Sequence, residues 1–444
     1  MIQAKGVQAG VDVICLVLLS FYIIGGAAIV PFHGDESSKI YVGRDFYFLF
    51  LEGDREKLTH QAKRSASSGE YRANLASGSI SNMIYGWLAA SGGYAITELN
   101  DDWHWGRDYK YNMESNRVPD ARLLQTARLA LAAQLAAAAT LFYVFARITI
   151  NRPTALLASL LFAAHPTLLL NGRRALQEGS HMLGIMLVLL AAAWLLRQRR
   201  WRGYALLGAC AGLAIAIKHT SALLVALVFL AIAGLSVYES LGTGDTRNKL
   251  IMRPLAGILM TGIVTLLVFY LLNPGWWDAP LETAGDVMSE RSALLQRQAG
   301  VYGGYQSLGQ QAKGFFRFVL IGEAQYFEDK QWAGYAEISE QIRIYESSGW
   351  AGATIGGNAI AALVMLALVS AGIIMLVRDR DISFQNRALL LFWGGGTAAI
   401  VFALTPLPWA RYYLPVLPFV LMMAAYALTS MAGAMRERID TARR

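Results

Sequence analysis

The feature that most constrains this chain is a series of long apolar segments. Two of them run together almost without interruption in "GYALLGACAGLAIAIKHTSALLVALVFLAIAGL" (203–235). About 20 apolar residues are needed to cross a bilayer as a helix. The chain of 444 residues is 55% hydrophobic and only 16% charged, whereas soluble domains carry about 25% charged residues. We therefore predict an integral membrane protein.

The apolar segments predict an all-α integral membrane bundle of about ten transmembrane helices. Lys218 and His219 mark a tight turn between the fifth and sixth of these helices. The ten expected spans are 11–31, 122–147, 153–170, 178–196, 203–218, 219–238, 254–273, 354–377, 386–405 and 411–431.

Basic residues collect in alternate loops between these spans, which explains much of the net charge of +8. The segments are "RITINRP", "RQRRWRG", "RNKLIMRP", "VRDRDISFQNR" and "RERIDTARR". Lys and Arg are enriched in short cytoplasmic loops. The pattern places both termini in the cytoplasm, with the first span an uncleaved anchor in the cell (cytoplasmic) membrane. No basic surface with interleaved aromatic residues suggests a nucleic-acid partner.

The same alternation places two long polar segments, 32–121 and 274–353, on the outer face. The first contains two aromatic, amphipathic stretches, 44–54 and 80–96, which we expect to be helices at the membrane interface. The second is rich in Gly, Tyr and Gln, and long loops of this kind are usually lids or binding loops. We expect a single transmembrane domain over 1–444 and no separate C-terminal soluble domain.

Asp35 and Glu36 follow the first span, in the first outer segment. Asp35 precedes a short stretch that could open a helix, so one interpretation is a helix N-cap. The other is a general base beside a membrane cavity. The residues alone leave both interpretations open.

Further costly charges lie at the outer ends of spans. Arg174 and Glu178 are four residues apart, so they form either a helical ion pair or part of an anion site together with Arg173. Lys218 and Arg411 either extend to the headgroups or bind an anion, and an arginine suits bidentate contact with phosphate.

Other common chemistries leave no signature here. The sequence has no P-loop and no Gly-x-Ser-x-Gly elbow. Cys15 and Cys210 both fall inside apolar runs, which argues against a disulfide framework or a cysteine metal site. We predict no required metal, with a divalent ion at His33 or Glu178 as the weaker alternative.

Taken in order, these features resemble GT-C membrane glycosyltransferases, in the branch of the protein O-mannosyltransferases and bacterial aminoarabinose transferases. The matching motifs are "GDE" (34–36), "HPTLLLNGRRALQE" (165–178), "GLAIAIK" (212–218) and "RYYLPVLPF" (411–419). This chain has Glu178 where the family usually has Asp.

The resemblance implies an inverting transfer of a sugar from a polyprenyl-phosphate donor to a protein, lipid or glycan acceptor at the outer face. Asp35, with Glu36 beside it, would supply the catalytic base, and Glu178 a second acid near the acceptor. The donor phosphate would be bound by residues from three motifs: Arg173, Arg174, Lys218, His219, Arg411 and Tyr412.

Two other classes compete with this interpretation. A transporter or flippase of lipid-linked sugars would also need polar groups between spans, but transporters usually show inverted repeats and broken helices near the midplane. A non-catalytic scaffold would not need acids and cations gathered at one face. The sequence identifies neither the sugar nor the acceptor.

Overall fold

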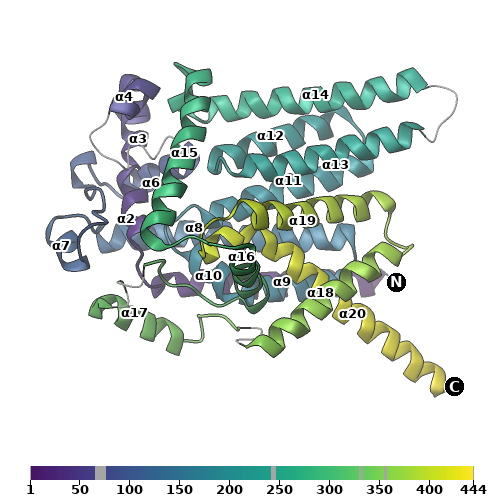
Figure 1. The fold of residues 1–444 in the computed structure, drawn as a ribbon. Coiled ribbons are helices and arrows are strands. Elements are labelled where there is room, and N and C mark those ends of the chain that lie inside the picture. The colour runs from purple at the N-terminus through teal and green to yellow at the C-terminus, as the bar shows by residue number, and fades with distance from the viewer. Residues whose placement is uncertain are drawn as a thin grey trace.

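The computed structural model is built of helices, and the residues it describes contain no strand (Figure 1). It describes residues 2–65, 77–241, 247–329, 332, 334–354 and 358–443. The gaps fall within the predicted outer segments 32–121 and 274–353, in the loop after the sixth predicted span, at the start of the predicted span 354–377, and at the ends of the chain. Those parts of the predictions lie outside the described residues.

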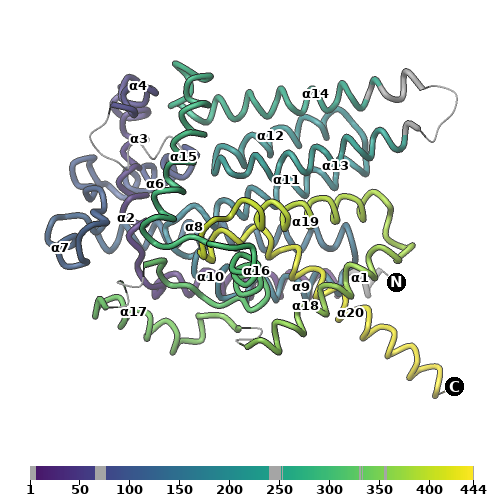
Figure 2. The backbone as a smooth tube through the Cα atoms, viewed as in Figure 1, coloured from purple at the N-terminus to yellow at the C-terminus, as the bar shows by residue number. Residues whose placement is uncertain are grey.

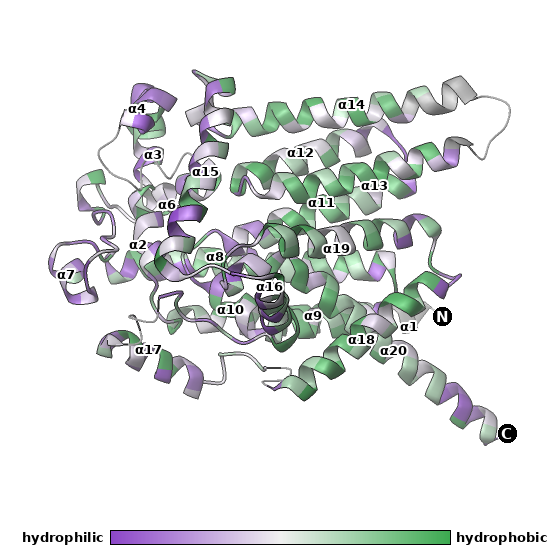
Figure 3. Ribbon diagram, in the orientation of Figure 1, coloured by the Kyte–Doolittle hydropathy of each residue, from purple (hydrophilic) through white to green (hydrophobic). Residues whose placement is uncertain are grey.

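Eight helices in the described ranges are long and apolar enough to cross a membrane. This confirms the predicted all-α membrane architecture. The eight are α1 (Ile2–Gly25), α8 (Ala121–Thr149), α11 (Glu178–Gln198), α13 (Ser221–Leu241), α14 (Arg247–Leu271), α18 (Ala359–Arg378), α19 (Phe384–Leu404) and α20 (Leu417–Ala442). Figure 3 shows their apolar colouring, with hydrophilic residues concentrated toward the two ends of the bundle.

The third expected span, 153–170, is not one straight helix. It is a pair, α9 (Arg152–Ala164) and α10 (Pro166–Arg173), bent by 61° at His165. Pro166 explains the break, because a residue before proline is disfavoured in helical conformation, and His165 has extended backbone angles (φ −74°, ψ 118°). The fifth expected span is α12 (Trp201–Ile217), a shorter helix of 17 residues.

Small residues allow α12 and α14 to pack closely. A Cβ added at Gly208 or Gly212 would lie 2.6 Å from the carbonyl oxygen of Thr261 or Thr265, respectively. The hydroxyl of Thr265 in turn donates a hydrogen bond to the carbonyl of Gly208 (3.2 Å). Small residues at such positions are typical of helix contacts in membranes, where close backbone approach drives association.

The loops predicted to be cytoplasmic lie at the end of the bundle near both termini (Figure 2). Ion pairs stabilise this end. Asp12 is buried and lies 2.8 Å from Arg147 and 2.7 Å from Arg152. Arg199 pairs with Glu239 at 2.8 Å. The first two contacts connect α1 to α8 and α9, and the third connects the end of α11 to α13.

The two predicted outer segments gather at the opposite end (Figures 1 and 2). The first forms α2 (Gly34–Tyr41), α3 (Arg44–Phe46) with a following π-helical turn (Tyr47–Leu51), α4 (His60–Ser65), α6 (Ser79–Ser91) and α7 (Tyr109–Glu114). The second forms α15 (Pro280–Tyr302), α16 (Leu308–Phe316) and α17 (Ala336–Ser347). α15 runs across this end of the bundle rather than along it.

Candidate active site

A polar cavity of about 390 Å³ lies at the end formed by the two long loop segments. Its walls come from α2, the start of α11, the turn between α12 and α13, α15, residues 327–329 with Trp332, and the stretch 409–412. The ionisable groups on its lining are His33, Asp35, Lys39, Glu178, Lys218, Arg291, Arg297, Glu328, Asp329 and Arg411.

The N-terminus of α2 presents Asp35 to this cavity. His33, not Asp35, is the N-cap: its Nδ1 accepts a hydrogen bond from the amide of Asp35 (3.1 Å). Glu36 completes the capping box by accepting the amide of His33 (3.0 Å). The N-cap interpretation of Asp35 is therefore wrong, and the carboxylate of Asp35 stays available for contacts across the cavity.

Glu36, unlike Asp35, is enclosed by protein groups and does not face the cavity. Its side chain is 0% exposed, and both oxygens accept hydrogen bonds from Arg128 at 2.8 Å. A third contact comes from the amide of Ala175 (2.8 Å). Glu36 is absent from the cavity lining that the described residues form. It connects α2 to α8 and to the loop before α11, so it acts on Asp35 only by fixing the helix.

Arg411 lies between two carboxylates. It forms an ion pair with Asp35 and lies 3.3 Å from Glu328, whose other oxygen is 2.7 Å from Nε2 of His33. Burial raises the pKa of Asp35 and is the largest single influence on it, but Arg411 and His33 together outweigh burial and hold that pKa below its ordinary value. Asp35 is therefore ionised at neutral pH.

Lys218 occupies the turn between α12 and α13, as the sequence predicts. Its ammonium lies 3.1 Å from Glu178, and both residues line the cavity. In the part of the chain that the structure describes, Glu178 pairs with Lys218 and not with Arg174. The helical ion pair considered from the sequence is thus replaced by a contact between two elements.

Arg173 and Arg174 do not lie on the cavity lining formed by the described residues. Arg173 donates to the carbonyls of Tyr22 (2.6 Å) and Ile23 (2.7 Å) at the end of α1. Arg174 donates to the carbonyls of Pro31 (2.9 Å) and Tyr326 (2.7 Å). Arg173 therefore satisfies carbonyls left open at the end of α1, and Arg174 satisfies carbonyls of the two loop segments, which makes both guanidiniums structural.

The last two predicted phosphate ligands, Tyr412 and His219, lie in different surroundings. Tyr412 lines the cavity. His219 instead packs edge-on against Phe269 and Trp276, each with a centroid distance of 5.6 Å. Its imidazole thus lies among aromatic rings, and His219 is absent from the cavity lining that the described residues form.

A second, apolar groove of about 110 Å³ adjoins the polar cavity. The two share four lining residues, which are Lys218, Arg291, Arg411 and Tyr412. The rest of the groove is mainly aliphatic, from α13, α15 and α19: Leu223, Leu224, Leu295, Ile400, Val401 and Leu404. The cations therefore stand where a polar space meets an apolar one.

Two residues of the candidate site, Arg291 and Glu328, are not predicted from the sequence. Arg291 lies in "SERSALLQRQ" (289–298) on α15, a helix whose course across the bundle no local pattern shows. Glu328 lies in an irregular stretch of the second loop segment. The only signal was the length of that segment, which predicted a lid but no particular residue.

Aromatic side chains complete the cavity wall on the loop side. Trp332 stacks on His33 (centroids 5.6 Å apart, planes 19° apart), and Trp409 stacks on Tyr412 (5.5 Å, 22°). Flat rings beside polar groups suit ligands with both apolar and hydrogen-bonding faces. Within the described ranges, no group of three or more His, Cys, Asp or Glu residues could hold a metal ion.

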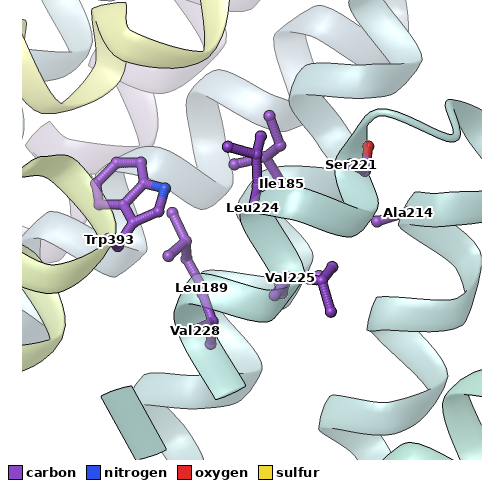
Figure 4. A pocket seen from close by; sticks show the side chains of 9 residues that line it. Ile185, Leu189, Ala214, Ser221, Leu224, Val225, Val228 and Trp393 are labelled. Atoms are coloured by element: carbon purple, nitrogen blue, oxygen red, sulfur yellow. The ribbon is translucent and has the colours of Figure 1, made fainter. Parts of the chain in front are cut away.

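A third pocket, in the core of the bundle, has no such chemistry. Figure 4 shows Trp393 and Ser221 beside it among aliphatic side chains of α11, α12 and α13. Its volume of about 10 Å³ is about that of one water molecule on this measure. The cavity at the loop end is therefore the candidate site.

Comparison with known proteins supports the same architecture. Residues 123–241, from α8 to α13, match the model of the dolichyl-phosphate-mannose-protein mannosyltransferase family. No curated protein matches the sequence.

Solved structures match over nearly the whole chain. ArnT from Cupriavidus metallidurans, bound to undecaprenyl phosphate, is 14% identical with a TM-score of 0.52, covering 95% of this chain and 60% of that one. The oligosaccharyltransferase of Archaeoglobus fulgidus in the apo form is 13% identical, with a TM-score of 0.51 over 97% of this chain and 52% of that one. The same archaeal enzyme, AglB, with an inhibitory peptide and a dolichol-phosphate, is 12% identical, with a TM-score of 0.50 over 97% and 51%. This chain thus spans about half to three fifths of their length, and the likeness is one of fold.

Proposed function

We propose that this chain, which has the fold of the GT-C membrane glycosyltransferases, is an inverting glycosyltransferase that uses a polyprenyl-phosphate-linked sugar at the outer face of the membrane. One observation carries the proposal: a polar cavity with an ionised carboxylate continues into an apolar groove past shared cations. A lipid-linked sugar phosphate has the same order of parts, namely polar sugar, anionic phosphate and apolar chain.

The donor fits this order of surfaces. The polyprenyl chain would lie in the groove between α13, α15 and α19, and the phosphate would meet Lys218, Arg291 and Arg411 at the junction. The names of two structural neighbours agree with such a donor, since one is bound to undecaprenyl phosphate and the other to a dolichol-phosphate. Arg173, Arg174 and His219 are left out of this phosphate site because their contacts lie elsewhere.

The chemistry is a single displacement. The acceptor oxygen forms a bond to the anomeric carbon while the bond from that carbon to the phosphate oxygen breaks, and its electron pair leaves with the polyprenyl phosphate. The acceptor proton passes to Asp35. Cations placed where negative charge develops stabilise such a transition state, and Lys218, Arg291 and Arg411 stand in that position. One displacement inverts the anomeric configuration.

Asp35 is the best-placed base of the acids on the cavity. It is ionised at neutral pH, and the capping box of α2 fixes its backbone. Both Asp35 and Glu178 form ion pairs, with Arg411 and Lys218 respectively, but Glu178 adjoins the phosphate side of the cavity. Glu328 accepts from His33, so it supports the loop that faces Asp35.

The acceptor would approach from the loop side, between the aromatic residues and Asp35. It is a protein, lipid or glycan that carries a hydroxyl. The alternation of basic loops places this face outside. A transporter or flippase would need a path toward the other end, but the described lining of the cavity comes from the loop end alone, which favours transfer.

Replacement of Asp35 by Asn tests the assignment. Asn keeps the shape of the side chain but cannot take the acceptor proton, so turnover should fall by about 10²–10⁴-fold, the usual contribution of a positioned base. Donor affinity should stay near that of the wild type. The assay is sugar release from a radiolabelled lipid donor by purified protein.

Asp101→Asn is the matched control, because Asp101 is an exposed acid of the same loop segment, 3.9 Å from Arg44, and should keep full turnover. Near-normal transfer by the Asp35→Asn protein would reject Asp35 as the base. An inactive Glu178→Gln variant beside an active Asp35→Asn variant would move the base to α11.

A further inference from the structure

We propose that Nε2 of His181 is an additional hydrogen-bond donor to the phosphate of the lipid-linked substrate. The inference rests on the proposed donor and assigns it a contact that the motifs above do not include. His181 would donate this hydrogen bond as a neutral side chain, whereas the neighbouring Lys218, Arg291 and Arg411 carry positive charge.

His181 lies in the first turn of α11, three residues after Glu178. It is 4% exposed, and its Nε2 atom is buried without a hydrogen-bond partner among the described residues. A buried polar atom without a partner costs about 1–3 kcal/mol. Such an atom beside a cavity indicates a partner that arrives with a ligand.

The groove supplies the place for that partner. His181 lines the apolar groove together with Lys218, Arg291 and Arg411, the residues that the groove shares with the polar cavity. His181 belongs to the lining of the groove and not to that of the polar cavity. It therefore stands on the lipid side of the cations, where the phosphate is joined to the polyprenyl chain.

The chemistry of the phosphate suits an imidazole. A sugar phosphodiester carries one negative charge and no proton, so it can only accept hydrogen bonds. A neutral imidazole offers one N–H donor. The leaving polyprenyl phosphate is more negative than the diester, and hydrogen bonds to charged acceptors are the stronger ones. His181 should therefore bind the product phosphate more tightly than the donor.

A second buried histidine provides a matched control. His165 is also 4% exposed and has an unpartnered nitrogen, Nδ1, in the described part of the chain. It lies at the bend between α9 and α10 against Gly322 and lines neither the cavity nor the groove as the structure describes them. Its replacement disturbs packing of a similar kind without touching the proposed contact.

The test measures binding of undecaprenyl phosphate and of undecaprenol to purified protein in detergent. His181→Leu should weaken binding of undecaprenyl phosphate about tenfold, the effect of losing one hydrogen bond to a charged group, and leave undecaprenol unchanged. His181→Gln, whose amide nitrogen reaches a similar position, should restore most of the affinity. His165→Leu should bind undecaprenyl phosphate like the wild type.

Equal affinity of the wild-type and His181→Leu proteins for undecaprenyl phosphate would overturn the inference while leaving the proposed function intact. A wild-type protein that does not distinguish undecaprenyl phosphate from undecaprenol would instead overturn the proposed donor. If His181→Leu fails to fold, a His181→Met protein takes its place. It should bind undecaprenyl phosphate more weakly than His181→Gln, and equal affinities of the two proteins would overturn the inference.

Discussion

The adjacent carboxylates of Asp35 and Glu36 have different roles because their surroundings differ. Asp35 and Glu36 are adjacent on α2, yet one faces a cavity and the other is enclosed by Arg128 and the amide of Ala175. The sequence could predict that one of the pair would face a cavity. It could not predict that Arg128, 92 residues away, would bind the other, because that contact depends on how α8 packs on α2.

The enclosed carboxylate should matter for stability. Glu36→Gln leaves Arg128 buried without its charged partner, and breaking a buried pair in this way typically costs about 3–5 kcal/mol. Thermal unfolding of the purified variant should show a clear drop in Tm, whereas Asp35→Asn should unfold close to the wild type. A Glu36→Gln protein with the wild-type Tm would contradict this structural role.

Arg411 should control the pH dependence of the reaction. Burial raises the pKa of Asp35 and Arg411 lowers it, with a net shift below the ordinary 3.8. The base must be deprotonated, so wild-type kcat/KM should stay flat from pH 8 down to about 5. Removing the cation by Arg411→Gln raises the pKa of Asp35, so residual activity should already fall within that range as the pH drops.

The measurement is the pH profile of kcat/KM for both proteins in the same detergent. Lys39→Gln serves as a control, because Lys39 also lines the cavity but does not contact Asp35 in the described part of the chain. Its acid limb should match that of the wild type. Identical acid limbs for the wild type and Arg411→Gln would show that Arg411 does not set the ionisation of the base.

At the scale of elements, apolar length predicted the helices well and their course less well. In the described residues each of the ten expected segments contains a helix, but eight of these helices are long and apolar enough to span a membrane alone, and 153–170 bends at His165. The His165–Pro166 pair in the sequence indicates this bend, because a residue before proline is disfavoured in helical conformation. By contrast, the sequence leaves an ion pair or an anion site open for Arg173 and Arg174, and the family resemblance implies a phosphate contact. The carbonyls at the end of α1 and in the loop segments satisfy them instead, and only the folded chain brings those groups near.

α15 is the element that brings Arg291 to the junction between cavity and groove. Its position is fixed from α4: Asp286 lies 2.8 Å from His60 and 3.3 Å from Arg64. Asp286→Asn should loosen this anchor, so the KM for the lipid donor should rise severalfold while kcat changes less. Steady-state kinetics with varied donor measures the two separately.

Glu282→Gln is the control on the same helix, because Glu282 is exposed in the first turn of α15 and should leave both constants unchanged. A kcat that falls with an unchanged KM would mean that α15 acts on the chemical step and not on donor capture.

At the scale of the whole molecule, the loops predicted to be cytoplasmic meet at one end and the two long segments meet at the other (Figure 2). The topology predicts that cysteines introduced at Lys110 and Glu340, both exposed, react with an impermeant reagent added to intact cells. A cysteine at Glu437 should react only after permeabilisation. The inverse pattern would place the cavity inside and reject the proposed reaction at the outer face.

The division of the cavity wall has a consequence for engineering. The lipid and phosphate side is built by spans and α15, whereas the opposite side is built by loop residues such as Trp105, Phe327 and Trp332. Chimeras that exchange only the loop residues around Trp105, Phe327 and Trp332, and keep α2 and α15, should therefore change which acceptor is modified while keeping the same lipid carrier. Over evolutionary time, such a wall would let one membrane scaffold diversify its products by altering loops that never contact the bilayer interior.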